Sequence, residues 1–389
     1  MRILFVGPPG SVHAARWANQ LTGIGWDVHF FASIPSAIRP EFKGLTIYGV
    51  SVYRPPGLDP SVRLRGFWPL RRGAWHVALP FRRFSPLVLA SLIRRLRPDV
   101  VHSLGVQHGG YLTLEARERL LPTFPPWVVS NWGSDIHFFG RKPEHEARIR
   151  SVMSACDYVQ AECERDIRLA REFGFGGEMF RIVPCGGGFD LEQMKRFRQP
   201  GPPSARRVIV VKGMEGGFGR GLVALRALEL CAEELRDYRA AVTLASPEVE
   251  VEARRVQHET GISIDVESQR WPRDYVLALH GRSKIFVGIA VSEGANTSML
   301  EALVLGSFPI QSCTACADEW LVDGQSGLIV PPDDPAVIAG AIRRALSDDD
   351  LIDRAAELNE QVVAERLDER IVRPLVVSRY REVVDAGRS

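Results

Sequence analysis

Short apolar runs alternate with longer amphipathic runs along most of this chain. The first example is residues 2–7, which have the composition of a buried strand, followed by an amphipathic helix at 13–21 and a second strand at 27–32. Strands that alternate with helices form mostly parallel sheets with helices on both faces. This alternation constrains the fold more than any other feature, and it predicts an α/β protein with doubly wound, Rossmann-like sheets.

The alternation is interrupted by Gln199-Pro-Gly-Pro-Pro-Ser-Ala, whose composition is typical of a linker. After it the pattern restarts, with strands at 207–211, 240–244, 262–266, 285–291 and 308–311. We therefore predict an N-terminal domain at 1–198, a linker at 199–206 and a C-terminal domain at 207–370. A last helix at 371–389 contains Pro374, and we expect it to be kinked or divided into two parts and to pack back towards the N-terminal domain.

One stretch of the second domain places a candidate anion site between two acids. A strand at 285–291 and a helix at 298–305, capped by Thr297 or Ser298, are joined by a loop of small polar residues. Such a loop opens onto helix N–H groups, which bind phosphate. Glu293 in the loop and Glu301 in the helix add acceptors for hydroxyl groups. A ligand that carries phosphates and hydroxyls, such as a nucleotide sugar, fits this stretch.

Composition excludes several classes of protein. The chain has 389 residues, of which 45% are hydrophobic and 25% charged, and its net charge of +2 gives no electrostatic argument for nucleic acid. No apolar run approaches the roughly 18–20 residues that span a membrane, and the N-terminus lacks the features of a signal peptide. We expect a cytoplasmic protein. Cys313 and Cys316 form one CxxC without a second pair, which favours packing residues over a metal or redox site.

Residues 54–97 are strongly basic, with ten arginines against one acid, Asp59. Aromatic residues are interleaved with these arginines. Basic side chains with aromatic anchors are typical of contact with an anionic membrane surface. The alternatives are a solvated face or an acceptor pocket, and nucleic acid is the interpretation we favour least.

Four segments resemble, in order and spacing, the retaining glycosyltransferases of family four. They are Pro184-Cys-Gly-Gly-Gly-Phe-Asp190, the E-x7-E stretch Ser292–Ala302, Gly306-Ser-Phe-Pro-Ile310 and Asp323–Asp333. The resemblance covers nearly the whole chain. It implies a GT-B fold, in which two Rossmann-like domains face a central cleft. It also implies that the C-terminal domain binds a UDP- or GDP-type sugar donor and the N-terminal domain binds the acceptor.

The resemblance also implies roles for residues of the donor site. Glu301 would accept hydrogen bonds from the ribose and Glu293 from the transferred sugar. Lys212 and Arg220 would bind the diphosphate, in the reverse of the family's usual order. The backbone groups near sugar and diphosphate would belong to Gly10, Gly294, Ala295, Asn296 and Thr297. The alternative for these charged residues is ordinary solvated surface.

Three N-terminal residues complete the set of candidates. His102 ends a predicted strand, and by the resemblance it approaches the reacting centre as a catalytic group. The alternative is that His102 is a buried structural histidine. His13 and Asp135 are candidates for contact with the acceptor; the alternatives are that His13 lies on a helix surface and that Asp135 caps the N-terminus of a helix.

The expected chemistry is transfer of a sugar, preferably a hexose, to an acceptor hydroxyl. We expect the anomeric configuration to be retained and the reaction to need no metal or other cofactor. The preferred acceptor is a lipid-linked saccharide in surface polysaccharide or glycolipid assembly, used by a peripheral enzyme at the inner membrane face. A GT-B nucleotide-sugar epimerase is the alternative. A glycosidase that uses Glu293 and Glu301, or a non-catalytic membrane- or partner-binding protein, is favoured less.

Overall fold

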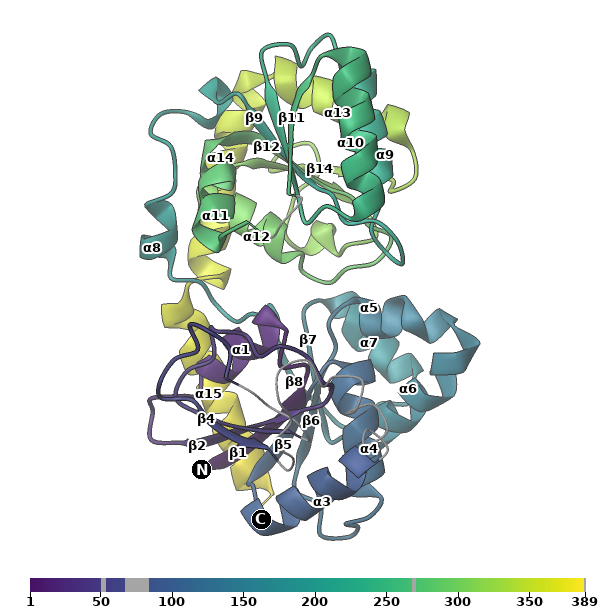
Figure 1. Cartoon of the computed structure of the whole chain (residues 1–389), viewed down its shortest axis with the longest axis vertical. Coiled ribbons are helices and arrows are strands. Elements are labelled where there is room, and N and C mark those ends of the chain that lie inside the picture. The colour runs from purple at the N-terminus through teal and green to yellow at the C-terminus, as the bar shows by residue number, and fades with distance from the viewer. Residues whose placement is uncertain (50–53, 67–83, 268–270, 388–389) are drawn as a thin grey trace. The chain divides into compact units, whose positions relative to one another are not determined.

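The computed structural model describes residues 1–49, 54–66, 84–267 and 271–387, and the chain divides into two compact units (Figure 1). The N-terminal unit comprises Met1–Gly187 and Val372–Ser389, and the C-terminal unit comprises Gly188–Ile371. The division therefore falls earlier than the expected boundary at 198.

Residues 199–206 are packed chain, which differs from the linker that we expected. The amide of Gln199 donates to the carbonyl of Gly281 at 3.0 Å. Arg206 is 2% exposed and donates Nη1 to the carbonyls of Ser283 (3.2 Å) and Leu305 (3.0 Å). These bonds tie the proline-rich segment into the C-terminal unit, because a buried guanidinium requires acceptors.

The described residues of the N-terminal unit form a parallel sheet in the order β4-β3-β2-β1-β5-β6-β7-β8. Its strands are β1 (Arg2–Gly7), β2 (Asp27–Ala32), β3 (Thr46–Gly49), β4 (Arg63–Gly66), β5 (Val100–Leu104), β6 (Trp127–Ser130), β7 (Tyr158–Ala161) and β8 (Glu178–Ile182). The strand order reverses between β1 and β5, so the loops that follow these two strands flank the switch point of the sheet.

Helices cover both faces of this sheet because strand side chains alternate between the faces. Ile3 and Phe5 pack with α1 (Val12–Asn19) and α15 (Glu369–Ala386). The neighbouring Leu4 and Val6 pack on the opposite face. The helices of that face are α3 (Ser85–Leu96), α4 (Tyr111–Arg117), α6 (Pro143–Ala155) and α7 (Glu164–Glu172).

The C-terminal unit contains a second parallel sheet, in the order β11-β10-β9-β12-β13-β14. Its strands are β9 (Val208–Lys212), β10 (Arg239–Thr243), β11 (Ser263–Val266), β12 (Ser283–Gly288), β13 (Phe308–Ser312) and β14 (Leu328–Val330). The strand order reverses between β9 and β12, which places the switch point beside the ends of these strands.

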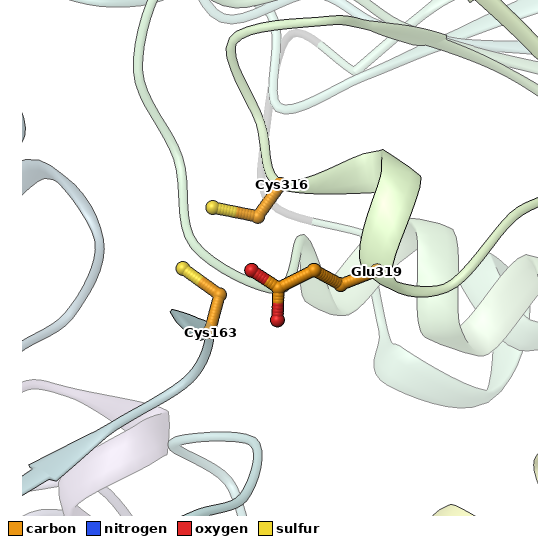
Figure 2. Close-up of side chains that lie close together, drawn as sticks. All are labelled: Cys163, Cys316 and Glu319. Atoms are coloured by element: carbon orange, nitrogen blue, oxygen red, sulfur yellow. The ribbon is translucent and has the colours of Figure 1, made fainter. Parts of the chain in front are cut away.

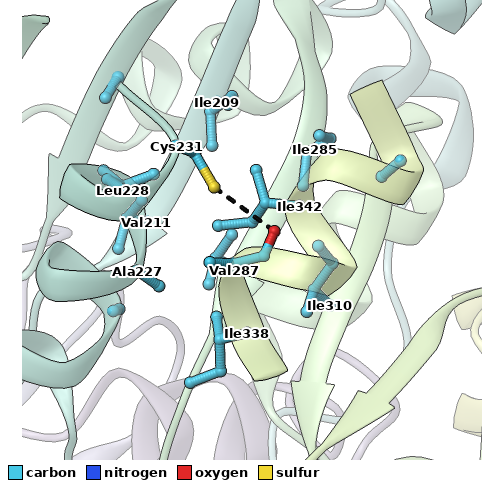
Figure 3. Close-up of a cluster of buried hydrophobic side chains, with 14 of the residues drawn as sticks. Ile209, Val211, Ala227, Leu228, Cys231, Ile285, Val287, Ile310, Ile338 and Ile342 are labelled. Carbon is cyan, nitrogen blue, oxygen red and sulfur yellow. Dashed lines mark hydrogen bonds between the residues drawn. The ribbon is translucent and has the colours of Figure 1, made fainter. Parts of the chain in front are cut away.

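Two hydrophobic layers stabilise this second sheet. On one face, shown in Figure 3, strand residues such as Ile209 and Ile285 pack against α9 (Gly221–Leu230), α10 (Pro247–Thr260) and α13 (Pro335–Ser347). The other face packs against α8 (Leu191–Lys195), α11 (Arg273–Arg282), α12 (Thr297–Leu305) and the end of α14 (Asp349–Arg366). The prediction of two doubly wound α/β domains is confirmed.

Several local predictions differ from the structure. β5 continues to Leu104, two residues beyond the end expected at His102. The last helix is one element with Pro374 inside it. Within the described residues, no helix is long and apolar enough to cross a membrane.

His280 provides a test of the core of the C-terminal unit. It is fully buried on α11 against Phe286, with ring centroids 5.2 Å apart, and neither ring nitrogen has a hydrogen-bond partner among the described residues. Burial lowers its pKa to about 4. The unfolded chain therefore binds this proton first as the pH falls below about 6.5, and stability is lost from there down to the folded pKa.

We predict that His280→Leu makes unfolding less sensitive to acid. Between about pH 7.5 and 5.5, the free energy of unfolding of the wild type should fall by about 1.4 kcal/mol more than that of the variant. Urea unfolding at both pH values measures this difference. The exposed His258→Leu serves as control and should behave as the wild type. Equal pH dependence of His280→Leu and wild type would contradict the prediction.

Candidate functional site

The switch point of the C-terminal sheet holds a largely buried ion pair. Lys212 is the last residue of β9, and Glu293 follows β12, the neighbouring strand. The Lys212 ammonium pairs with Glu293 Oε1, and the two side chains are 7% and 14% exposed. The structure thus brings together two of the predicted donor-site residues. Their opposite charges neutralise each other where both side chains are largely buried.

The loop after β9 is joined to the loop after β12 by backbone pairing. Gly219 forms an antiparallel bridge with Ala290, and the amide of Val291 donates to the carbonyl of Phe218 at 2.8 Å. The amide of Arg220 donates to the carbonyl of Ile289 at 3.1 Å. This pairing places Arg220, the second predicted cation, at the same edge of the sheet as Lys212.

Arg220 is also held by its side chain. Its Nε donates to Asp333 Oδ1 at 2.7 Å, and its Nη1 donates to the carbonyl of Gly219 at 2.9 Å. Asp333 lies in the loop after β14 and is 67% exposed. Both predicted cations are therefore paired with carboxylates that come from other loops at the carboxyl ends of the strands.

Residues of β13 hold the loop that carries Glu293. Ser312 Oγ donates to the carbonyl of Ala290 at 2.7 Å and accepts from its amide at 3.1 Å. Gln311 is fully buried and crosses over Gly288, where an added Cβ would lie 2.2 Å from the Gln311 amide nitrogen. Any residue larger than glycine at position 288 would therefore require the end of the Gln311 side chain to move.

The helix that follows this loop is capped by Asn296, and our expectation of Thr297 or Ser298 as the cap was wrong. Asn296 Oδ1 accepts from the amides of Ser298 (3.0 Å) and Met299 (3.5 Å). α12 begins at Thr297 as a result. The cap occupies two of the N–H groups that a helix N-terminus offers.

Glu301 lies one turn into α12 with its side chain 12% exposed. Its Oε1 is 3.7 Å from Arg273 Nη2, at the start of α11. A carboxylate offers about four positions that accept hydrogen bonds.

Gly10 and His13 lie on the loop and helix that follow β1. Ser11 Oγ accepts from the amide of Ala14 at 3.3 Å and caps α1. A Cβ at Gly10 would lie 3.1 Å from Ser36 Oγ, so the loop packs closely on the segment after β2. The His13 ring lies edge-to-face with Trp132, with ring centroids 6.1 Å apart.

His102 lies inside the core, away from the carboxyl edge of the sheet. Its Nδ1 hydrogen-bonds to the Tyr380 hydroxyl at 2.5 Å and its Nε2 to Ser130 Oγ at 2.8 Å. Burial lowers the pKa of His102 to about 3. Trp17 Nε1 donates to the same tyrosine at 2.9 Å. This geometry is that of the structural alternative, because a fully buried imidazole with both nitrogens bonded has no access to a ligand.

Asp135 joins two loops at the carboxyl edge. Its Oδ2 accepts from the amides of Val106 (2.9 Å) and Trp132 (3.2 Å), and the side chain is buried. Burial raises its pKa despite these bonds. Its carboxylate therefore braces the loops after β5 and β6, and it is not the N-cap of α5 (Ser134–His137), which is Gly133.

Sequence reasoning missed several residues that the structure places at these edges. Gln107 and the exposed His108 follow β5 at the switch point of the N-terminal sheet, on a π-helical turn, Val106–Gly110. Asp333 holds Arg220, and Gln311 supports the Glu293 loop. The position of Gln107 and His108 just after a buried strand could have indicated them. Nothing in the sequence indicated the partners from distant strands.

The cysteines carry no disulfide among the described residues. Figure 2 shows Cys316 and Glu319 on the loop and short helical turn that follow β13, and Cys163 just before α7 of the N-terminal unit. We do not treat these three side chains as a metal site, because they belong to separate units. Cys313 is exposed and Cys316 buried.

Two family models match this chain. Residues 2–162 match the glycosyl transferase 4-like family, and residues 230–362 match the glycosyl transferases group 1 family. No curated protein matches the sequence. The two matches fall in the two units and together span most of the chain.

Solved structures show the same fold at low sequence identity. Sucrose-phosphate synthase from Thermosynechococcus elongatus superposes with a TM-score of 0.70 at 15% identity, covering 99% of this chain and 100% of that one. HepE from Anabaena, in complex with UDP, gives 0.66 at 14% identity, covering 99% of each chain. The UDP-forming trehalose-phosphate synthase from Burkholderia xenovorans gives 0.68 at 16% identity, covering 98% of this chain and 99% of that one.

The fold is thus that of the GT-B glycosyltransferases, with a candidate site at the switch point of the C-terminal sheet. The chain belongs to the group 1 glycosyltransferases and is an enzyme of that class.

The brace formed by Asp135 can be tested through stability. We predict that Asp135→Ala lowers the free energy of unfolding by about 2–4 kcal/mol, because two buried amides lose their acceptor. Asp135→Asn, which keeps one acceptor oxygen, should cost less. Urea unfolding measures both, with the exposed Asp237→Ala as control. A fully stable Asp135→Ala protein would contradict the bracing role and favour the predicted contact with the acceptor.

Proposed function

We propose that this enzyme transfers a sugar from a nucleoside diphosphate sugar to an acceptor hydroxyl, with retention of configuration at the anomeric carbon. The observation that carries the proposal is the arrangement of Lys212, Arg220, Glu293 and Glu301 at one switch point, where doubly wound sheets bind their ligands. HepE, whose structures contain UDP and UDP-glucose, has the same fold and supports a donor of this class.

The donor diphosphate would replace carboxylates as the partner of the two cations. A phosphate group that approaches Lys212 competes with Glu293, and one that approaches Arg220 competes with Asp333. Glu293 would then accept hydrogen bonds from the sugar and Glu301 from the ribose. The exchange keeps each cation paired, which matters because an uncompensated charge is costly in a largely buried site.

In the proposed reaction the acceptor oxygen bonds to the anomeric carbon on the face from which the diphosphate leaves. The bond between that carbon and the diphosphate oxygen breaks, and the departing phosphate takes the proton of the acceptor hydroxyl. Lys212 and Arg220 stabilise the negative charge that develops on the leaving group. Neither Glu293 nor Glu301 acts as a nucleophile in this scheme. Analysis of the product should show that the transferred sugar keeps the anomeric configuration that it had in the donor. An inverted anomeric configuration would exclude this mechanism.

We predict that nucleoside diphosphates raise the melting temperature of the wild type. The increase should be much smaller for the double variant Lys212→Met/Glu293→Gln and for the single variant Glu301→Gln. The double variant removes the cation without leaving its acid unpaired. A charge-assisted hydrogen bond contributes about 1.5–3 kcal/mol, so affinity should fall at least about tenfold. Thermal shift with UDP, GDP and ADP measures binding and the base preference.

Matched controls are Lys195→Met and Glu357→Gln, which change the same residue types on the surface of the C-terminal unit. Both should bind as the wild type does. If none of the diphosphates shifts the melting temperature of the wild type, the proposed donor class is wrong. Formation of an epimerised nucleotide sugar in the absence of any acceptor would instead favour the epimerase alternative.

We also propose that transfer needs no metal ion, because Lys212 and Arg220 supply the positive charge at the leaving group. We predict that EDTA leaves the rate of sugar transfer unchanged. The rate is measured by release of the nucleoside diphosphate before and after chelation. Loss of activity that added Mg²⁺ or Mn²⁺ restores would show that the two cations are insufficient.

We propose that the acceptor is a saccharide presented on a lipid, in surface polysaccharide or glycolipid assembly, and that the enzyme docks on an anionic membrane face. Support comes from the described part of the basic segment 54–97; its residues 67–83 lie outside the described residues. Phe84, directly before α3, is 45% exposed, and Leu87, in the first turn of α3, is 52% exposed. The exposed arginines among the described residues of this segment are Arg54, Arg63, Arg65, Arg94, Arg95 and Arg97.

We predict that the protein sediments with vesicles of phosphatidylcholine and phosphatidylglycerol but not with phosphatidylcholine alone. Arg94→Gln/Arg95→Gln should weaken binding by about tenfold or more, since each arginine near an anionic surface contributes about 1 kcal/mol. Arg226→Gln/Arg236→Gln, two exposed arginines of the C-terminal unit, is the control. Equal losses in both variants, or no vesicle binding at all, would contradict membrane docking.

A further inference from the structure

Polar groups that the proposed donor chemistry does not use gather at the carboxyl edge of the N-terminal sheet. Asn131 is fully buried, and neither atom of its amide has a hydrogen-bond partner among the described residues. The same holds for Trp132 Nε1 and Gln107 Oε1. A buried polar atom without a partner costs about 1–3 kcal/mol, so three side chains of this kind at neighbouring strand ends indicate a surface that bonds to a ligand.

Asp135 links the Trp132 backbone to the Gln107 side chain. Its carboxylate accepts from the amide of Trp132, and its main-chain carbonyl accepts from Gln107 Nε2 at 2.7 Å. Asn131 directly precedes Trp132. The ends of β5 and β6 are adjacent in the sheet, so the groups from both strands form one cluster.

Trp132 gives this cluster an aromatic platform. A Cβ at Gly105 would lie 3.5 Å from the Trp132 ring, so the indole packs directly over this glycine, whose φ of 82° suits its turn. The His13 ring meets the indole edge-to-face. The indole remains partly exposed while these neighbours fix its orientation. A fixed aromatic surface bordered by amide groups suits a sugar, whose C–H face stacks on the ring while its hydroxyls bond to polar atoms.

The charges around the cluster disfavour an anionic ligand. Three buried acids lie at this edge, Glu162, Asp135 and Asp166, and the pKa of Asp166 is raised to about 6 by burial. Arg165 lowers the pKa of Asp166, and His108 lowers that of Asp135, but burial outweighs both effects. Arg165 is already bonded to Asp166 and to the carbonyl of Gly133. A phosphate or carboxylate placed here would lie near the buried carboxyl groups of Asp135 and Asp166 in a poorly solvated site, which is unfavourable.

We propose that Trp132, Asn131 and Gln107 form a subsite for an uncharged sugar residue of the acceptor. The inference rests on the proposed function and narrows it: the part of the acceptor that lies at the ends of β5 and β6 is a neutral pyranose, and any phosphate of the acceptor binds elsewhere.

The test uses the full chain and simple glycosides as probes. Saturation-transfer NMR is recorded with millimolar methyl α-glucopyranoside, methyl α-mannopyranoside and methyl β-galactopyranoside, and with glucose-6-phosphate. We expect at least one neutral glycoside to bind, with affinity about tenfold weaker in Trp132→Ala, the effect of losing one aromatic contact. Trp132→Phe should retain most of the binding. Trp26→Ala, which alters a partly buried tryptophan at the opposite edge of the same sheet, should bind as the wild type does.

Several outcomes would overturn the proposal. They are binding of glucose-6-phosphate alone, binding of none of the neutral glycosides, and equal binding by Trp132→Ala and wild type. Binding of UDP, GDP and ADP to the same variants is measured in parallel. Retained diphosphate binding without sugar binding would reject the subsite and leave the donor proposal standing. If the wild type binds none of these diphosphates, the proposed function itself is wrong.

Discussion

The ion pair between Lys212 and Glu293 is the interaction on which the candidate donor site depends. Both side chains are almost fully removed from solvent, and charges in such a place are stable only when each has a partner. The pair can exist because β9 and β12 are neighbours at the point where the strand order reverses. Residues 81 positions apart in the sequence are thereby held at one edge of one sheet.

The surrounding loops preserve that pair through backbone and side-chain bonds that the ligand does not need to supply. Backbone pairing of Gly219 with Ala290 fixes the two loops to each other. Ser312 fixes the second loop to β13. These bonds hold the loops without a ligand, so in the proposed function a diphosphate that replaces the carboxylates would require little reorganisation of the backbone. In the N-terminal unit, Asn131, Trp132 and Gln107 have buried polar atoms with no hydrogen-bond partner among the described residues.

Much of the fold followed from the sequence because periodicity is a local signal. The strands at 2–7 and 27–32 have the bounds that we expected. Gly306 ends its helix in the left-handed conformation, as a glycine at that position predicts. Predictions about the surroundings of a residue were weaker. His102 follows the strand residues Val100 and Val101, but the strand continues past it to Leu104. Its hydrogen-bond surroundings include Tyr380, which also bonds to Trp17, so they come from the two ends of the chain. The proline-rich segment 199–206 looked like a linker because composition does not show that Arg206 has buried acceptors.

The sequence by itself determined the alternation of strands and helices, the two doubly wound sheets and the residue types of the candidate donor site. These depend on hydrophobic periodicity and on short motifs, which each segment carries in its own residues. Only the tertiary structure decided which charges pair. It matched Lys212 with Glu293 and Arg220 with Asp333, turned Asp135 into a brace and placed Trp132 beside His13. Such contacts join loops that are distant in sequence, and strand order, which no single segment encodes, decides which loops meet.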